Sequence, residues 1–179
     1  MEQVLETHYP YRGQVLNLRV DRVRVPSGAE TLREIAEHRG AVAVVALDAE
    51  NRVALVRQYR HAVGRVLVEL PAGTLEAGES PADCAPRELR EETGLSAQRW
   101  ERLARFFPSP GVLSEEMHIY LARDLAEGDY EPLSDEDLTV ERVPLADALE
   151  RVARGEIADA KSIIGLLLTR DKLNTMTTP

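Results

Sequence analysis

Apolar positions along the chain fall into short runs that turn residues separate. Residues 41–47 form a continuous apolar run, which predicts a strand buried on both faces. Residues 52–57 and 66–70 predict two further strands, the first preceded by a turn at residues 49–51 and the second ended by Pro71. Three more strands are predicted at residues 99–106, 117–123 and 139–143. These strands are interleaved with helical segments, so the sequence predicts an α/β fold around a mixed sheet.

Three segments have the pattern of helices. The first begins with Ser80, which can cap a helix, and Pro81, which suits its first position, and Gly94 provides its stop. Residues 146–153 and 160–172 predict the other two, and residues 174–179 are expected to fray. An apolar stripe on the last helix predicts contact with the core through Ile163, Ile164, Leu167 and Leu168.

Pro86 conflicts with the first of these helices. A proline inside a helix removes the hydrogen bond to the carbonyl four residues earlier, here that of Ala82, at a cost of about 3 kcal/mol. The sequence therefore predicts either a kinked first turn or a regular helix that starts later.

The N-terminal part has little apolar material of its own. In residues 11–25 apolar positions alternate with polar ones, and this alternation then changes phase. The pattern predicts either one strand with a bulge or two strands. Residues 26–28 form a turn, and residues 31–38 are ambiguous by propensity. This part could hardly fold alone, because it has few large apolar residues.

Charge and composition narrow the partners and the compartment. The chain has 179 residues and a net charge of -9, which argues against nucleic acid and anionic membrane as partners. Cys84 is the only cysteine, so no internal disulfide can form, and a small buried thiol is the expected role. No apolar run is long enough to span a bilayer, and the polar start does not resemble a signal peptide. A soluble cytoplasmic protein is expected.

Residues 73–95 concentrate acidic side chains. Three of them, Glu88, Glu91 and Glu92, have i, i+3 and i+4 spacing, so a helix places them on one face. Like charges so close destabilise a bare helix, and a hard cation with oxygen ligands, Mg²⁺ above all, would reverse that effect. The alternative is a solvated acidic face. The other acids of the segment are Glu76, Glu79 and Asp83, and its only cations are Arg87 and Arg90.

The same segment resembles the signature of the Nudix hydrolases. Gly73, five residues, Glu79, seven residues, Arg87-Glu88-Leu89, then Glu91-Glu92 and Gly94-Leu95 fill every fixed position of that signature. Three flanking segments resemble the ADP-ribose pyrophosphatase branch: Leu70-Pro71-Ala72, Val56-Arg57-Gln58-Tyr59-Arg60 and Ser109-Pro110-Gly111. The resemblance is weak before Gly40 and strong from there to about residue 145.

The resemblance implies an architecture and an assembly. It implies a Nudix-type α/β/α sandwich around a mixed sheet at residues 40–179, with a small N-terminal β subdomain at residues 1–39. In the family such a subdomain resembles a sheet that packs across a twofold axis, so residues 31–38 are expected to form a strand and the protein a homodimer.

The resemblance also implies hydrolysis of a nucleoside diphosphate linked to another group, with Mg²⁺ as the cofactor and Mn²⁺ as an alternative. The implied metal ligands are Glu88, Glu92 and the backbone carbonyl of Ala72, and Glu91 either binds metal or braces the others. Arg87 is expected to hold nearby carboxylates in place, with Glu79 in a similar bracing role. Such a reaction needs a metal to neutralise the diphosphate, a base for water and cations for the far phosphate.

The base is expected outside the signature. Glu136 matches the relevant loop best, and its neighbours Asp135 and Asp137 stay open as alternatives. Glu115, whose position resembles one near the terminal ribose, is the second choice and is also expected to contact substrate. An ordinary glutamate is already ionised at neutral pH, so the base needs no strong pKa shift.

Substrate contacts are expected from a few further residues. Arg60 resembles a family arginine that contacts the diphosphate. Base stacking would need an aromatic side chain, and the candidates are Tyr9, Tyr11 and Phe107. His61 and His118 have no second ligand at helical or hairpin spacing and are expected to be structural.

Three functions remain open on this basis. The favoured one is Mg²⁺-dependent hydrolysis of ADP-ribose or a related ADP-sugar to AMP and a sugar phosphate. The same chemistry on another nucleotide sugar, a dinucleotide or a nucleoside triphosphate is the enzymatic alternative. A nucleotide-sensing module without catalysis is the alternative of another class, although the complete signature and the absence of a basic patch argue against it.

Overall fold

The computed structural model describes residues 1–128 and 138–177, which form two compact units. The smaller unit comprises Met1–Gly40 and Phe106–Glu116, and the larger comprises Ala41–Arg105 and Met117–Pro179. The predicted boundary after residue 39 lies next to the first of these limits. Phe106–Glu116 was expected in the second domain, but its contacts assign it to the smaller unit.

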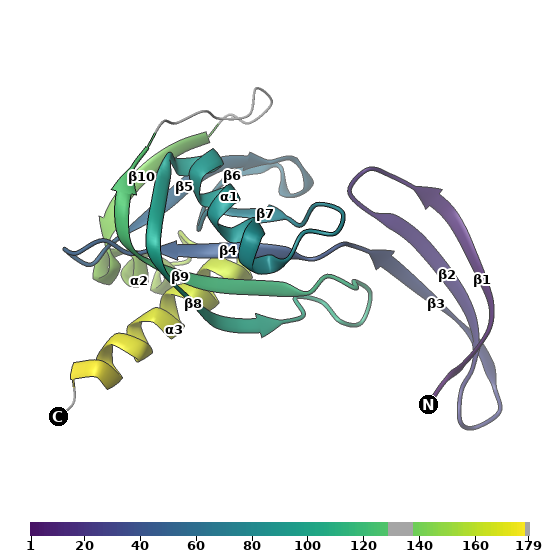
Figure 1. Cartoon of the computed structure of the whole chain (residues 1–179). Helices are drawn as coiled ribbons and strands as arrows, with labels where there is room; N and C mark the ends of the chain where they lie inside the picture. Colours follow the sequence, from purple (N-terminus) through teal and green to yellow (C-terminus); the bar gives the residue numbers. More distant parts are fainter. Residues whose placement is uncertain (129–137, 178–179) are drawn as a thin grey trace. The chain divides into compact units, whose positions relative to one another are not determined.

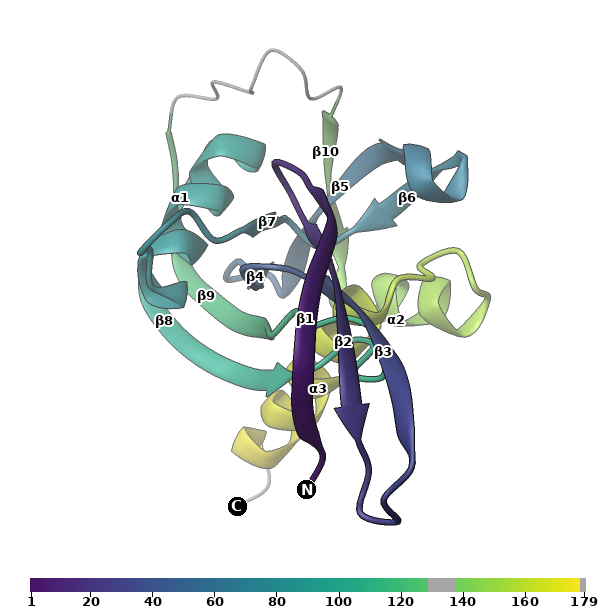
Figure 2. The ribbon, with the colours of Figure 1, turned by 90° about the vertical axis from the view of Figure 1, so that its right-hand side faces the viewer.

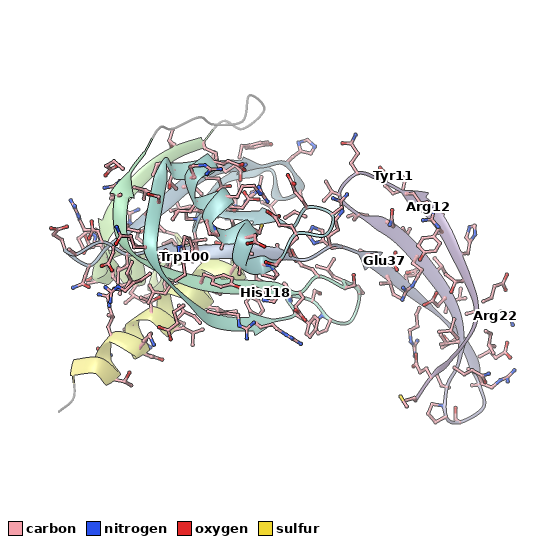
Figure 3. All side chains as sticks on the ribbon, viewed as in Figure 1. Tyr11, Arg12, Arg22, Glu37, Trp100 and His118 are labelled. Atoms are coloured by element: carbon pink, nitrogen blue, oxygen red, sulfur yellow. The ribbon has the colours of Figure 1, made fainter. Side chains whose placement is uncertain are left out.

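The smaller unit is an antiparallel sheet of β1 (Gln3–Arg12), β2 (Asn17–Arg24) and β3 (Glu30–Glu37), in that order. Residues 11–25 contain the end of β1 and all of β2, but the phase change between Val20 and Val23 lies inside β2, whose pairing with β3 is uninterrupted. Residues 31–38 include a strand, as the resemblance implied. Val23 is the one buried hydrophobic residue among residues 1–40. Charged and aromatic side chains cover this sheet, including Tyr11, Arg12 and Glu37 (Figure 3). Such a surface agrees with the expectation that this part does not form a core of its own.

The segment Phe106–Glu116 belongs to the smaller unit because it joins the end of β3. The Ala36 N–H donates to the carbonyl of Val112 at 2.8 Å, and the Ser114 N–H donates to the carbonyl of Ala36 at 3.0 Å. These bonds satisfy backbone groups that would otherwise be unpaired at the edge of the strand.

The larger unit holds a four-stranded sheet in the order β7-β4-β9-β8. The strands are β4 (Ala41–Ala46), β7 (Ala72–Thr74), β8 (Leu95–Phe106) and β9 (Met117–Glu127). Strand β4 pairs parallel with β9 and antiparallel with β7, so the predicted mixed sheet is confirmed. Every residue of β4 is buried, as its continuous apolar run predicts.

A second sheet has three strands in the order β10-β5-β6. These are β5 (Arg52–Arg60), β6 (Arg65–Glu69) and β10 (Leu138–Pro144), and the short 3-10 helix η1 (His61–Val63) connects β5 with β6. Figure 2 shows these three strands as neighbours, separate from the curved pair β8 and β9. The pairing places Val56 opposite Glu69, so an acidic residue at the end of β6 lies opposite a buried valine.

Helices cover both faces of the four-stranded sheet (Figure 1). Helix α1 (Pro81–Thr93) packs on the face that carries Val42 and Val44. Helix α3 (Ala160–Thr177) packs on the other face, which carries Val45 and Ile119. The predicted α/β/α sandwich is confirmed. Helix α2 (Leu145–Ala153) buries Ala148. Within the part of the chain that is described, no helix has the length and apolar character to cross a membrane.

Helix α3 does not use its apolar stripe as predicted. The fully buried positions are Ser162, Leu166 and Thr169, whereas the residues of the stripe are half-buried: Ile163, Ile164, Leu167 and Leu168. The reason is close approach, because a Cβ at Gly165 would lie 2.6 Å from Cδ1 of Leu70. Three of the four buried residues on this face are small, Ser162, Gly165 and Thr169, and Leu166 is the large one. The helix also continues to Thr177, beyond the start of the predicted frayed end.

Candidate active site

Helix α1 positions the acidic side chains, and its ends lie where the sequence predicts them. The Ser80 side chain accepts a hydrogen bond from the Asp83 N–H, and Pro81 occupies the first turn. Gly94 has φ of 69°, a left-handed conformation that glycine adopts without steric cost, and its N–H donates to the carbonyl of Arg90.

Pro86 lies within a helix that runs from Pro81 to Thr93, so the prediction of a later start is wrong. Both Pro86 and Ala82, whose carbonyl loses its usual donor, are exposed. Water can therefore hydrate that carbonyl, which lowers the cost of the missing bond. The three clustered glutamates follow Pro86, and their helical spacing is intact.

Two of the three glutamates point into the protein. Glu88 is 9% exposed and Glu92 only 2%, whereas Glu91 is half-buried. Burying carboxylates without compensation is costly, so these positions are unlike a solvated acidic face. The structure therefore disfavours the simpler alternative that the sequence left open.

Strand β7 lies against both buried carboxylates. The Ala72 N–H donates to Oε2 of Glu92 at 2.8 Å. Gly73 is so close to Glu88 that a Cβ at this position would lie 1.9 Å from Cδ of that glutamate. A glycine is required there because any side chain would occupy the space of the carboxylate. The strand at Ala72 and Gly73 and the helix face at Glu88 and Glu92 thus form one site.

Arg87 holds the remaining acids, as the sequence predicts. Its Nε and Nη2 donate to the two oxygens of Glu79 at 2.8 and 2.9 Å. Its Nη1 lies 2.9 Å from Oε1 of Glu88 and 2.9 Å from Oε2 of Glu91. The hydrogen bonds from Arg87 lower the pKa of Glu79 to about 2, and the pKa of Arg87 is raised in return. One guanidinium therefore fixes three carboxylates.

The residues present fit a hard cation better than a soft one. All donors at the site are oxygens: the carboxylates of Glu88 and Glu92 and the carbonyl of Ala72. Within residues 1–128 and 138–177, no group of three His, Cys, Asp or Glu side chains could hold a metal ion. Glu91 is half-buried and pairs with Arg87, so the carbonyl of Ala72 is the further oxygen ligand that the resemblance implies beside the two buried carboxylates. The assignment of these ligands stays a prediction.

Cys84 lies one helical turn before Glu88 and is fully buried. Burial first, and then the charge of Glu88, raise the pKa of its thiol to about 12. A thiol with that pKa stays protonated and is a poor nucleophile. The predicted role of a small buried residue therefore agrees with its surroundings.

A second charged cluster joins the ends of β5 and β6 to the start of α3 and includes residues that sequence reasoning missed. Arg60 donates to the two oxygens of Glu69 at 3.0 and 2.7 Å. Lys161 of α3 contacts the same carboxylate and donates to Oδ1 of Asp159 at 2.9 Å. Sequence patterns give one signal for this cluster, an acid between the apolar residues Val68 and Leu70. The partner Lys161 lies 92 positions away and has no such signal.

Of the four candidates for the base, the structure describes only Glu115. Glu136, Asp135 and Asp137 lie outside the described residues. Glu115 belongs to the smaller unit, where its Oε1 lies 3.6 Å from Nδ1 of His38. Its role as base or substrate contact stays a prediction.

The aromatic and histidine candidates are divided between the units. Tyr9, Tyr11 and Phe107 belong to the smaller unit, and there the Arg12 guanidinium stacks 3.9 Å over the ring of Tyr9. In the larger unit His61 is exposed and forms an edge contact with Tyr59, whereas His118 on β9 is buried (Figure 3). None of these contacts identifies a base-stacking residue.

The sequence matches the NUDIX domain over residues 37–164. The chain belongs to the Nudix family. The match runs from the end of β3 into α3, so it includes the helix α1, the strand β7 and the charged cluster around Glu69. The predicted resemblance is confirmed.

Relatives of this Nudix protein cover most of its length. An ADP-ribose pyrophosphatase of Mycobacterium tuberculosis is 46% identical over 160 residues, which span 88% of this chain and 77% of the relative. A protein named methanol dehydrogenase activator of Bacillus methanolicus is 40% identical over 167 residues, 92% of this chain and 90% of the relative. An ADP-ribose pyrophosphatase of Bacillus subtilis is 40% identical over 163 residues, 90% of this chain and 88% of the relative.

A solved structure has the same fold. The crystal structure of an ADP compounds hydrolase superposes with a TM-score of 0.86 at 24% identity and covers 98% of this chain and 96% of that one. Similarity at this level of identity concerns the architecture, and it agrees with the sandwich described above.

Proposed function

We propose that this Nudix protein hydrolyses the diphosphate bridge of ADP-ribose or a related ADP-sugar, with Mg²⁺, to AMP and a sugar phosphate. The observation that carries the proposal is the pair of buried carboxylates, Glu88 and Glu92, held against Ala72 and Gly73 of β7. The names of two relatives, both ADP-ribose pyrophosphatases, support the substrate class.

Each residue of the site has a role in this proposal. Glu88, Glu92 and the carbonyl of Ala72 would hold the cation, with Mn²⁺ as an alternative to Mg²⁺. A bound divalent cation neutralises phosphate charge and lowers the pKa of coordinated water. Arg87 keeps Glu91 and Glu79 in place, and Arg60 contacts the diphosphate. The Arg60 side chain is 37% exposed, so part of it is open to solvent.

A substrate panel with product analysis tests the proposal. ADP-ribose, ADP-glucose, GDP-mannose, NAD⁺ and ATP are incubated with the protein and Mg²⁺, and products are separated by chromatography. Fastest release of AMP from ADP-ribose is expected. Faster turnover of NAD⁺ or ATP would indicate that the substrate is a dinucleotide or a nucleoside triphosphate. No turnover of any nucleotide would favour a nucleotide-sensing module without catalysis.

For the base we propose Glu136, with Asp135, Asp137 and Glu115 as alternatives. The comparison of Glu136→Gln with Glu115→Gln decides between the two loops. Loss of a general base reduces kcat by roughly 10²–10⁴-fold, so Glu136→Gln is expected to lower kcat by that amount. Glu115→Gln is expected to raise KM and to leave kcat near that of the wild type. The reverse pattern would assign the base to Glu115.

We also propose a homodimer in which the smaller unit contributes to the contact. Its strands and turns expose large apolar side chains, among them Val4, Tyr11 and Leu32. A second copy of the chain could cover such side chains, which supports this proposal. Sedimentation equilibrium should give a mass of two chains, and a mass of one chain at micromolar concentration would contradict the proposal.

The cytoplasm is the compartment that we propose. A single buried thiol at Cys84 and no internal disulfide suit a reducing environment. Fractionation of cells that express the tagged protein should recover it with soluble cytoplasmic markers, and recovery from the membrane or the medium would contradict this.

A further inference from the structure

Arg60 and Glu69 form a two-point ion pair in the larger unit. Nε of Arg60 donates to Oε1 of Glu69 at 3.0 Å, and Nη2 donates to Oε2 at 2.7 Å. The two side chains differ sharply in exposure, because Glu69 is 1% exposed as a residue and the Arg60 side chain is 37% exposed. The carboxylate is therefore fixed in the interior, while part of the Arg60 side chain is open to solvent.

Lys161 is the second cation on this carboxylate. Its ammonium contacts Oε2 of Glu69 and donates to Oδ1 of Asp159 at 2.9 Å. Asp159 in turn accepts from the Ser162 N–H at 3.1 Å, so the lysine is held by the first turn of α3. The Lys161 side chain is only 14% exposed, which leaves it little access to a ligand in solvent.

The charges of this cluster balance only when all members are present. Arg60 and Lys161 carry two positive charges, and Glu69 and Asp159 carry two negative ones. Displacement of Arg60 towards another anion would leave one net negative charge, and without Lys161 it would leave two. A buried carboxylate that loses its cations is strongly destabilised. When Lys161 is absent, this cost opposes any movement of Arg60 away from Glu69.

The electrostatics agree with this balance. Burial alone would raise the pKa of Glu69, but hydrogen bonds from Arg60 and the charge of Lys161 outweigh it, and the net shift is downward. The pKa of Arg60 is raised, first by its hydrogen bonds to Glu69, with a smaller contribution from the charge of Glu92. That contribution puts Arg60 within electrostatic reach of the acidic helix face.

We propose that Lys161 is a positioning residue for substrate binding: it retains the buried Glu69 carboxylate while Arg60 exchanges that carboxylate for a phosphate of the nucleotide. The proposal rests on the proposed function, in which Arg60 contacts the diphosphate. Lys161 acts through Glu69 and Arg60 and does not touch the substrate. Without Lys161, Arg60 is the only remaining cation on Glu69 and binds it at the expense of the ligand.

Binding of a non-hydrolysable ligand tests the proposal separately from turnover. The probe is α,β-methylene ADP-ribose with Mg²⁺, and its Kd is measured by calorimetry for the wild type and variants. Lys161→Met is expected to weaken binding about 10-fold, the size of one lost charged hydrogen bond. Lys161→Arg, which keeps the charge, should restore most of the affinity. The matched control is Lys172→Met on the same helix, where the lysine pairs with the exposed Glu101, and its Kd should equal that of the wild type.

A double-mutant cycle distinguishes positioning from a general structural effect. In an Arg60→Met background, Lys161→Met should change the Kd by less than about 2-fold, because the residue through which it acts is gone. Denaturant unfolding of each variant checks the fold. An unchanged Kd in Lys161→Met, or full additivity in the double variant, would overturn the proposal. Failure of the wild type to bind the probe would overturn it as well.

Failure of the proposed function has a different signature. A wild type that binds the methylene analogue but releases no AMP from ADP-ribose would refute the proposed hydrolase activity. The double-mutant cycle would then still decide whether Lys161 positions Arg60 for binding. A wild type that releases AMP while Lys161→Met binds normally would refute only the positioning role.

Discussion

Gly73 and Glu88 occupy almost the same space: a Cβ at position 73 would lie 1.9 Å from Cδ of Glu88 and 2.0 Å from its Oε1. The glycine of the signature is thus a steric requirement set by the glutamate 15 residues later. The backbone of β7 can approach α1 only because residue 73 has no side chain. This contact defines how the site is built, since β7 also carries the Ala72 carbonyl.

Gly73→Ala should therefore disable the enzyme without unfolding it. The added methyl group must displace the Glu88 carboxylate, and turnover of ADP-ribose is expected to fall by on the order of 100-fold, as for other residues that orient metal ligands. Gly111→Ala is the matched control, because a Cβ there meets no atom within 4 Å. Equal activity of the two variants would show that Glu88 does not act from the position described.

Glu92→Gln should abolish most turnover and spare the fold. Glutamine keeps a carbonyl oxygen that can accept the Ala72 N–H, which Glu92 accepts at 2.8 Å, but it loses the negative charge that holds a cation. A loss of about 100-fold or more in kcat is expected, with a change in unfolding free energy within about 1 kcal/mol. Glu101→Gln, an exposed glutamate paired with Lys172, serves as the control. Near-normal activity of Glu92→Gln would mean that the metal site lies elsewhere.

Acid should weaken the contribution of Glu79 to stability. Its pKa is about 2 in the folded protein, first because Arg87 hydrogen-bonds it, and about 4.3 in an unfolded chain. A lowered folded pKa means that the stabilisation is complete above about pH 4.3 and is lost as the pH falls towards 2. Urea unfolding of the wild type and of Glu79→Gln is measured from pH 7 to pH 3. The difference in unfolding free energy should stay constant at neutral pH and narrow below about pH 4.3. A difference that is the same at pH 7 and pH 3 would contradict the pairing.

Gly165→Ala tests the close contact between α3 and the sheet. Alanine favours an isolated helix by about 1 kcal/mol over glycine, but here its Cβ would lie 2.6 Å from Cδ1 of Leu70 and 3.1 Å from Cγ2 of Val45. Leu70 and Val45 are fully buried and have no room to move away. Overpacking of this kind costs about 1–3 kcal/mol, so thermal unfolding should show a net loss of stability. A stabilised variant would show that α3 lies farther from the sheet.

A local sequence pattern predicts an element of this fold correctly where only one structure can explain the pattern. The run at residues 41–47 is apolar on both faces, so β4 is buried on both faces. Ser80, Pro81 and Gly94 set the limits of α1 through capping and backbone geometry alone. Pro86 misled the prediction because the cost of a helical proline depends on whether the freed carbonyl reaches water. That exposure is a tertiary property.

Residue spacing also determined the core of the candidate site. Helical geometry places Glu88 and Glu92 on one face at any position in the molecule, and the signature around them indicated a cation. The sequence alone could not show that Arg87 pairs with Glu79, Glu88 and Glu91 together. Nor could it show that the Glu88 carboxylate occupies the space of a side chain at position 73. Glu69 and Lys161 were missed because burial of a carboxylate between two cations depends on packing between β6 and α3, whose residues are 92 positions apart. Local patterns in the sequence determine helix capping and periodicity. The balance of buried charges is determined only when elements that are distant in the sequence pack against each other.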